Sequence, residues 1–247
     1  MQEIIQQKMS ELRLSGMCQA YRTLLESGRQ QALTHDEMIS FLLQSEWEER
    51  ETRKADRSLK QAHFRYSASI QEIDFSKDRG VDKTLLLRLS EATFVKKKED
   101  ILITGATGSG KSFIASALGH QACQLGYKVM YSSTQKLFAR LKMAKGDGSY
   151  SKEISKIEKQ DVLLLDDFGF SRLDHYQREA LMEIMEDRHG RRSTIVASQL
   201  PVSNWYEIIG ESTLADAILD RLIHKAHRIE LTGESMRKKQ KESNPAS

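Results

Sequence analysis

The spacing of hydrophobic residues along the chain changes near residue 100. Before this point apolar residues recur at helical spacing, with one stripe in residues 12–25 and a second in residues 38–47. This spacing predicts amphipathic helices. Gly28 follows the first stripe and is typical of a helix stop, and Thr34 with Glu37 forms a capping box ahead of the second stripe. We therefore expect the first part of the chain to form a small all-α domain.

From residue 100 onward, short apolar runs alternate with helical patterns. The five runs are Ile101–Thr104, Val129–Ser132, Val162–Leu165, Thr194–Ala197 and Arg228–Leu231. The helical patterns between them are Phe113–Leu125, Gln135–Lys145, Tyr176–His189 and Leu214–His224. Such alternation is typical of a parallel sheet that has helices on both faces. We expect an α/β fold whose three-layer αβα core holds a parallel five-stranded sheet.

The pattern weakens between these two regions, so we expect a domain boundary there. Residues 74–80 resemble a loop and residues 84–94 a short helix. A chain of 247 residues suits one larger and one smaller domain, because domains usually span roughly 100–200 residues. We predict a helical N-terminal domain over residues 1–68, a linker over 69–99, a core over 100–235 and a basic, flexible tail over 236–247.

Composition favours a cytoplasmic protein that has no membrane partner. The charged fraction is 30% and the formal net charge is +3, which suits either a nucleic-acid partner or an ordinary soluble surface. Cys18 and Cys123 match no metal or redox spacing, so we expect no disulfide framework. The first residues lack a basic segment followed by an apolar one, so we expect no secretory signal, and no apolar run approaches the roughly 20 residues that span a bilayer. His224 and His227 share a helical spacing but have no ligand cluster nearby, so we expect no metal site there.

Residues 105–112 carry the strongest chemical signal. They read GATGSGKS and fit the pattern G-x-x-x-x-G-K-[ST], with an apolar run before them and a helical pattern after them. Glycines let the backbone wrap closely around a polyphosphate, and the helix N-terminus favours its negative charge. Lys111 can reach the outer phosphates, and the Ser112 hydroxyl can ligate Mg²⁺. We expect a nucleotide to bind Gly105, Ala106, Thr107, Gly108, Ser109, Gly110, Lys111, Ser112 and Phe113.

Two adjacent carboxylates, Asp166 and Asp167, follow the apolar run 162–165. Ligands bind beyond the carboxyl ends of strands in sheets of this kind, so these aspartates are expected beside the phosphate loop. Asp166 would help Ser112 to hold Mg²⁺, and Asp167 would be free to polarise the attacking water as a general base. The alternative is a pair of solvated loop residues, which the buried run before them disfavours.

Two further signals lie beyond the aspartates. Ser198 and Gln199 end another apolar run, where a polar side chain could position water or sense the γ-phosphate; the alternative, which ligand placement at strand ends disfavours, is a strand-ending turn before Pro201. Arg221 lies in the last helical pattern and could reach the nucleotide of a neighbouring subunit as an arginine finger. The alternative for Arg221 is a helix-surface residue paired with Asp220 or Asp216.

In this order, the four motifs resemble those of AAA+ ATPases, and in particular of the clade that contains the IstB transposition helper ATPases and the DnaC bacterial helicase loaders. Residues 14–17, the charged segment 46–65 and residues 233–237 are also similar to IstB sequences. Many AAA+ proteins carry glutamate at the position of Asp167. An aspartate there is similar to what IstB-like members carry. The chain is short after Leu231, so we expect no separate C-terminal helical lid.

The resemblance implies an ATPase that assembles on double-stranded DNA and helps a DDE-type transposase. It implies ATP, with Mg²⁺, bound between the subunits of a homo-oligomer, with Arg221 acting as a finger in trans. Ser198 or Gln199 would be the first sensor, and Arg237 a possible second sensor. Two other readings remain: a helicase loader that uses nucleotide state as a binding switch, and, more remotely, a small-molecule phosphotransferase.

The segment 46–65 is the first candidate for DNA contact. Its basic residues Arg50, Arg53, Arg57 and Lys60 are spaced by three and four, so they share one helix face and could follow a phosphate backbone. Acids stand four residues before three of them, which favours local pairing instead, and residues 1–70 hold ten basic and ten acidic side chains. Weaker candidate patches are Lys96, Lys97 and Lys98, and the tail lysines Lys238, Lys239 and Lys241.

Overall fold

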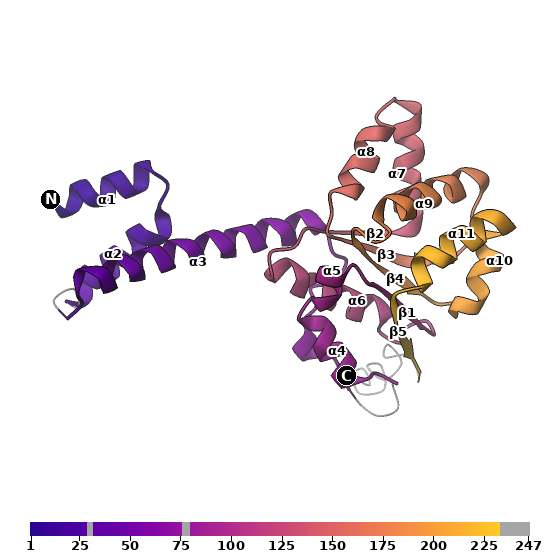
Figure 1. Cartoon of the computed structure of the whole chain (residues 1–247), viewed down its shortest axis with the longest axis horizontal. Coiled ribbons are helices and arrows are strands. Elements are labelled where there is room, and N and C mark those ends of the chain that lie inside the picture. The colour runs from indigo at the N-terminus through magenta and orange to yellow at the C-terminus, as the bar shows by residue number, and fades with distance from the viewer. Residues whose placement is uncertain (29–31, 76–79, 233–247) are drawn as a thin grey trace, which may run out of the picture. The chain divides into compact units, whose positions relative to one another are not determined.

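The computed structural model describes residues 1–28, 32–75 and 80–232, and the chain divides into two compact units, Met1–Arg57 and Ser58–Ser247 (Figure 1). None of the helices in these ranges is long and apolar enough to cross a membrane.

The first unit is helical, as the sequence predicts. It contains α1 (Gln2–Glu11), α2 (Ser15–Ser27) and most of α3 (His35–Ala62), which continues into the second unit. Gly28 ends α2 in the left-handed conformation with φ 65°, and the backbone N–H groups of Thr34 and Glu37 each bond to the other residue's side chain. Both predicted helix signals are therefore confirmed. A small core of Ala20, Leu24 and Leu42 holds the helices together.

The second unit alternates helices and strands. In chain order it contains η2 (Ile70–Glu72), α4 (Lys83–Ser90), α5 (Thr93–Lys97), β1 (Asp100–Gly105), α6 (Lys111–Gln124), β2 (Val129–Ser133), α7 (Thr134–Gly146), α8 (Tyr150–Glu158), β3 (Val162–Phe168), α9 (His175–Arg188), β4 (Ser193–Ser198), η4 (Val202–Asn204), α10 (Trp205–Ile209), α11 (Ser212–Ile223) and β5 (Ala226–Leu231).

The strands form one parallel sheet in the order β2-β3-β4-β1-β5. Successive side chains of a strand point to opposite faces, and each face is covered. Ile101, Ile103 and Leu164 face the cluster that includes α4, α5 and α6, whereas Leu102 and Leu163 face the cluster built by α7 to α11 (Figure 1). The predicted three-layer α/β core is confirmed.

Three local features differ from the sequence expectations. The strand predicted over 162–165 continues to Phe168, so it carries the two aspartates itself. The single helix expected over 84–94 is divided into α4 and α5, because Ala92 adopts a left-handed conformation with φ 53°. Helices α8 and α10 were not predicted. The apolar residues of 68–95, including Ile70, Leu86 and Phe94, pack in the same core cluster as the sheet.

Candidate active site

The phosphate-loop motif joins β1 to α6, as the strand–loop–helix pattern predicts. Gly105, Gly108 and Gly110 have φ values of 146°, 80° and 95°, a region that side chains rarely tolerate. A Cβ atom at Gly105 would also lie 2.5 Å from the carbonyl oxygen of Leu231. The glycines therefore shape a backbone cradle at the N-terminus of α6, where N–H groups favour an anion.

Lys111 is the first residue of α6 and lies inside this cradle. Lys111 is only 7% exposed, and its ammonium group donates a hydrogen bond to the carbonyl oxygen of Ala106 at 2.7 Å. Burial lowers the pKa of Lys111, and the nearby charges of Asp166 and Asp167 oppose this. A buried cation held at the loop is the group that a phosphate chain would engage.

Asp166 lies next to the loop, as expected. Its Oδ1 accepts a hydrogen bond from the Ser112 hydroxyl at 2.8 Å, and its Oδ2 accepts one from the Tyr131 hydroxyl at 2.7 Å. Burial and the bond to Asp166 raise the pKa of Tyr131, which keeps that hydroxyl a neutral donor. A carboxylate and a hydroxyl in contact form the hard oxygen set that Mg²⁺ prefers, so these residues fit the predicted cation.

Asp167 lies beside them in a strained backbone conformation. Its φ is 54°, which is uncommon for a residue other than glycine. Residues with such strained backbones cluster at functional sites. Burial, then the charge of Asp166, raises the pKa of Asp167, whereas Arg65 and Lys111 oppose this. Its Oδ2 lies 3.5 Å from Nη1 of Arg65.

An open cleft of about 320 Å³ unites these groups. It is lined by Arg65, Tyr66, Thr107, Gly108, Lys111, Ser112, Gln135, Asp167, Phe170 and Gln199. The Thr107 hydroxyl donates to Oε1 of Gln199 at 2.8 Å, which ties the phosphate loop to the end of β4. The loop, one aspartate and one sensor candidate therefore share a single cavity.

The other residues expected at the nucleotide differ in their surroundings. The buried Ser198 hydroxyl donates to the carbonyl oxygen of Phe168 at 2.7 Å and accepts from the Leu200 N–H at 3.1 Å, so it holds β3 and β4 together. Phe113 packs partly buried against the core cluster. Arg237 lies outside the described residues.

Arg221 lies on α11, next to α9. It forms an ion pair with Glu186, and its Nη1 donates to the carbonyl oxygen of Ala217 at 2.8 Å. The described residues that line the cleft do not include Arg221. Within one chain, the guanidinium is therefore held by α9 and by its own helix.

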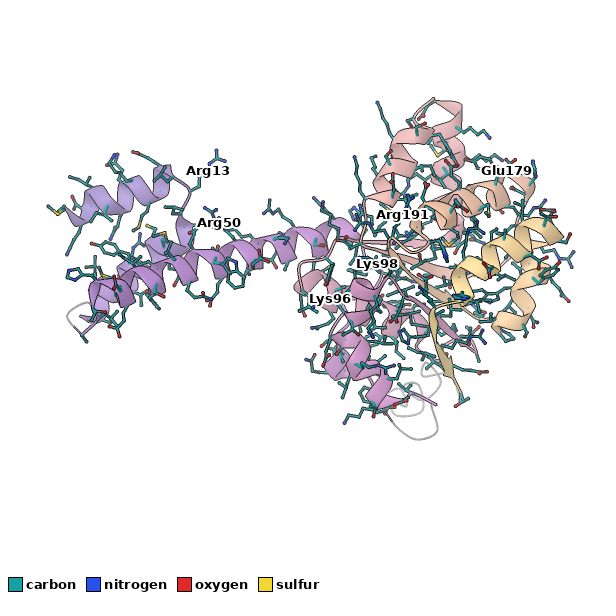
Figure 2. All side chains as sticks on the ribbon, viewed as in Figure 1. Arg13, Arg50, Lys96, Lys98, Glu179 and Arg191 are labelled. Carbon is teal, nitrogen blue, oxygen red and sulfur yellow. The ribbon has the colours of Figure 1, made fainter. Side chains whose placement is uncertain are left out.

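The four candidate DNA residues lie along α3. Arg50 and Arg53 each form an ion pair at 2.7 Å with the acid four residues before, as the local-pairing alternative expects. Nε of Arg57 donates to the carbonyl oxygen of Arg53 at 3.2 Å, and Lys60 completes the row in the last turn. Arg50 lies in the first unit, whereas Lys96 and Lys98 belong to α5 and its end (Figure 2).

Several residues of the cleft were not anticipated from the sequence. Arg65 and Tyr66 follow α3 and Phe170 follows β3, whereas Tyr131, in the middle of β2, contacts Asp166 beside the cleft. Arg65 lies 102 positions from its partner Asp167, and no local spacing indicates that contact. Only the general rule that ligands sit at strand ends pointed to this edge of the sheet.

The fold and this cleft define an AAA+ P-loop ATPase. Residues 7–244 match the family described as IstB-like ATP binding protein, and the chain belongs to that family. It is 43% identical over 234 residues to the putative insertion sequence ATP-binding protein y4pL of Sinorhizobium fredii, covering 95% of this chain and 96% of the relative. It is 38% identical to the putative ATP-binding protein of insertion sequence IS1162 of Pseudomonas fluorescens, over 79% of this chain and 85% of the relative.

Solved structures agree with the fold. The crystal structure of the DnaI is similar with a TM-score of 0.59 at 23% identity, over 67% of this chain and 92% of that one. The DnaC helicase loader is similar with a TM-score of 0.54 at 21% identity, over 60% of this chain and 87% of that one. The expected IstB-like ATP-binding family is confirmed by the sequence match, and these structures support the expected AAA+ fold.

Proposed function

We propose that this ATPase assembles on double-stranded DNA as a homo-oligomer, with ATP at subunit interfaces, and assists the transposase of the same insertion sequence. The observation that carries the proposal is an incomplete site: Lys111, Ser112 and Asp167 line one cleft, while Arg221 is held elsewhere in the same chain. An arginine finger can be supplied in trans, and the family resemblance implies that a second subunit supplies this one. Relatives named as insertion sequence ATP-binding proteins supply the biological context.

Each cleft residue has a distinct part in hydrolysis. The loop N–H groups and Lys111 bind the phosphates, and Ser112 with Asp166 would hold Mg²⁺, which neutralises phosphate charge when bound. Asp167 accepts the proton of the attacking water, for which a raised pKa is suitable. Gln199 is the better placed first sensor, because it lines the cleft and bonds to Thr107, whereas Ser198 is engaged in bonds between strands.

DNA contact through α3 rests on charge and geometry. Arg53, Arg57 and Lys60 are exposed on α3, and such a row can follow a phosphate backbone without reading bases. A transposase partner follows from the insertion-sequence context of the relatives. A second-sensor role for Arg237 rests on the family resemblance alone.

The test combines particle size with ATP turnover. Purified chain is examined by light scattering with and without Mg²⁺-ATP and a long DNA duplex, and phosphate release is measured in the same mixtures. We expect a multi-subunit particle only when ATP and duplex are both present, with faster hydrolysis in that mixture. A monomer under every condition would remove the assembly proposal. Co-purification with the element's transposase, with and without ATP, tests the partner and separates this function from a helicase loader's binding switch.

A further inference from the structure

The segment after α3 is fixed within the second unit by an aromatic anchor. The ring centroid of Phe64 lies 4.3 Å from that of His120 on α6 and 6.2 Å from that of Tyr131 on β2. Gly119 makes this approach possible, because a Cβ atom there would lie 2.6 Å from Cε1 of Phe64. One turn earlier, the Ser58 hydroxyl donates to the carbonyl oxygen of Tyr127 at 2.7 Å. The backbone that leads into residue 65 is therefore held at two points.

The next two residues enter the nucleotide cleft. Arg65 and Tyr66 both line it, and the Arg65 guanidinium lies 5.4 Å from the Tyr66 ring centroid, within cation–π range. Nη1 of Arg65 lies 3.5 Å from Oδ2 of Asp167. An arginine fixed at its backbone by Phe64 and at its side chain by Tyr66 is more ordered than a free surface arginine.

The strand that carries Asp167 does not fix the orientation of its carboxylate, so a contact from another segment has to do so. Its left-handed backbone, with φ 54°, turns the residue away from the regular strand, and the ladder between β3 and β4 shifts register here. Its N–H donates to Asp166 at 2.9 Å, but its carboxylate is about a third exposed. Within residues 1–28, 32–75 and 80–232, its one ion pair is with Arg65.

We propose that Arg65 is a positioning residue for ATP hydrolysis, which holds the Asp167 carboxylate toward the cleft. The inference rests on the proposed role of Asp167 as the group that accepts the water's proton. Exposed ion pairs contribute little to stability, so the effect belongs to catalysis and not to folding. Small displacements of a general base cost large factors in rate, because proton transfer needs hydrogen-bond geometry.

The experiment compares steady-state hydrolysis by full-length variants with Mg²⁺-ATP and duplex DNA. Arg65→Ala is expected to lower kcat about tenfold and to change the KM for ATP by less than about threefold. Arg65→Lys restores part of kcat, since it returns the charge without the planar fork. Gly119→Ala displaces Phe64 and lowers kcat in the same direction, although it removes no cleft side chain. Arg88→Ala, at an exposed arginine of α4, is the matched control.

Each result has a defined meaning. An unchanged or higher kcat for Arg65→Ala would overturn the proposal, as would a change confined to KM, which would make Arg65 a nucleotide contact only. Asp167→Asn is measured alongside. If it loses hydrolysis while Arg65→Ala does not, the positioning role fails and the role of Asp167 stands. If Asp167→Asn still hydrolyses ATP at the wild-type rate, the proposed role of Asp167 fails, and the positioning role with it.

Discussion

Lys111 is the cation around which the cleft is organised. It is buried, it bonds to the loop through Ala106, and two carboxylates lie near it. Because desolvation already disfavours its charge, a phosphate that replaces the lost hydration gains a strong partner. The charge of Lys111 is therefore most strongly stabilised when nucleotide is bound.

We predict that Lys111→Ala weakens ATP binding by about 10- to 100-fold, since a charged hydrogen bond contributes about 1.5–3 kcal/mol. Titration with a fluorescent ATP analogue measures the change. Lys142→Ala, at an exposed lysine of α7, is the control and is expected to bind as the wild type does. Equal affinity in wild type and Lys111→Ala would mean that the loop does not hold the phosphates.

At this scale the sequence predicts residues that act through fixed local spacing and misses those that act through tertiary contacts. Lys111 and Ser112 are specified by the loop motif, and the two aspartates by the end of an apolar run. Tyr131 and Arg65 reach the same aspartates from 35 and 102 positions away. Nothing in their own neighbourhoods identifies them, because sheet order and the path after α3 decide those contacts.

Individual elements are fixed by polar groups away from the cleft as well as by apolar packing. Arg188 at the end of α9 is 1% exposed, and its guanidinium donates to the carbonyl oxygens of Ile157 and Gln160 at 3.0 Å each. Asp100 at the start of β1 accepts from the Thr194 N–H at 2.6 Å. Burial raises the pKa of Asp100 to about 7, although Thr194 and the Arg188 charge oppose this.

This carboxyl gives a stability prediction with a definite sign. Its folded pKa of about 7 exceeds the ordinary value of 3.8, so the folded state binds the proton more tightly than the unfolded state. The resulting stabilisation is present below pH 3.8 and is lost as pH rises toward 7. Relative to Asp100→Asn, the wild type should lose about 1–4 kcal/mol of unfolding free energy across this range. Urea unfolding at pH 5 and 8 measures most of it; parallel losses in both proteins would contradict the prediction.

Helix α3 combines a structural and a candidate binding role. Glu46 accepts from the N–H groups of Gly16 and Met17 at 2.8 and 3.2 Å, so it stabilises the N-terminus of α2. Burial opposes ionisation of Glu46, but bonds from Arg50, Met17 and Gly16 outweigh it and lower its pKa. Arg50 is thus tied to the fold of the first unit (Figure 2). Arg53 and Arg57 are the more informative residues for DNA.

We predict that reversing Arg53 and Arg57 to glutamate weakens duplex binding and flattens its salt dependence, because each lost phosphate contact reduces the slope of log K against log salt by about 0.9. Fluorescence anisotropy across a salt series measures both quantities. The control reverses Lys8 and Arg22, two exposed residues of α1 and α2, and so makes the same change in net charge. Identical slopes for the two variants would return α3 to a purely structural role.

Elements that carry strong periodicity are predictable, and short ones are not. The five strands follow from their apolar runs, whereas α10 has five residues and too few turns to show a period. The break at Ala92 has no local signal either, because alanine favours helix, whereas here it is buried in the core with a left-handed backbone between α4 and α5. Strand order is a tertiary property that the runs do not encode.

At the scale of the whole molecule, the proposed finger makes the site a shared one. If Arg221 serves a neighbour's nucleotide, the contact between subunits is heterologous, with different surfaces on its two sides. In the isolated chain Glu186 pairs with this arginine. Assembly would then have to exchange that partner for a phosphate, which links hydrolysis to oligomer formation.

Mixing two inactive variants tests this arrangement. Lys111→Ala subunits bind ATP weakly but keep Arg221, and Arg221→Ala subunits keep the phosphate loop but lack the finger. Each alone should hydrolyse ATP poorly, since an arginine finger contributes about 10³–10⁵ in rate. In an equal random mixture, half of the sites have an intact loop and half of their neighbours an intact finger, so about a quarter of sites recover in a heterologous assembly. Phosphate release with duplex DNA measures the recovery. A finger acting within its own chain would leave the mixture as inactive as its components.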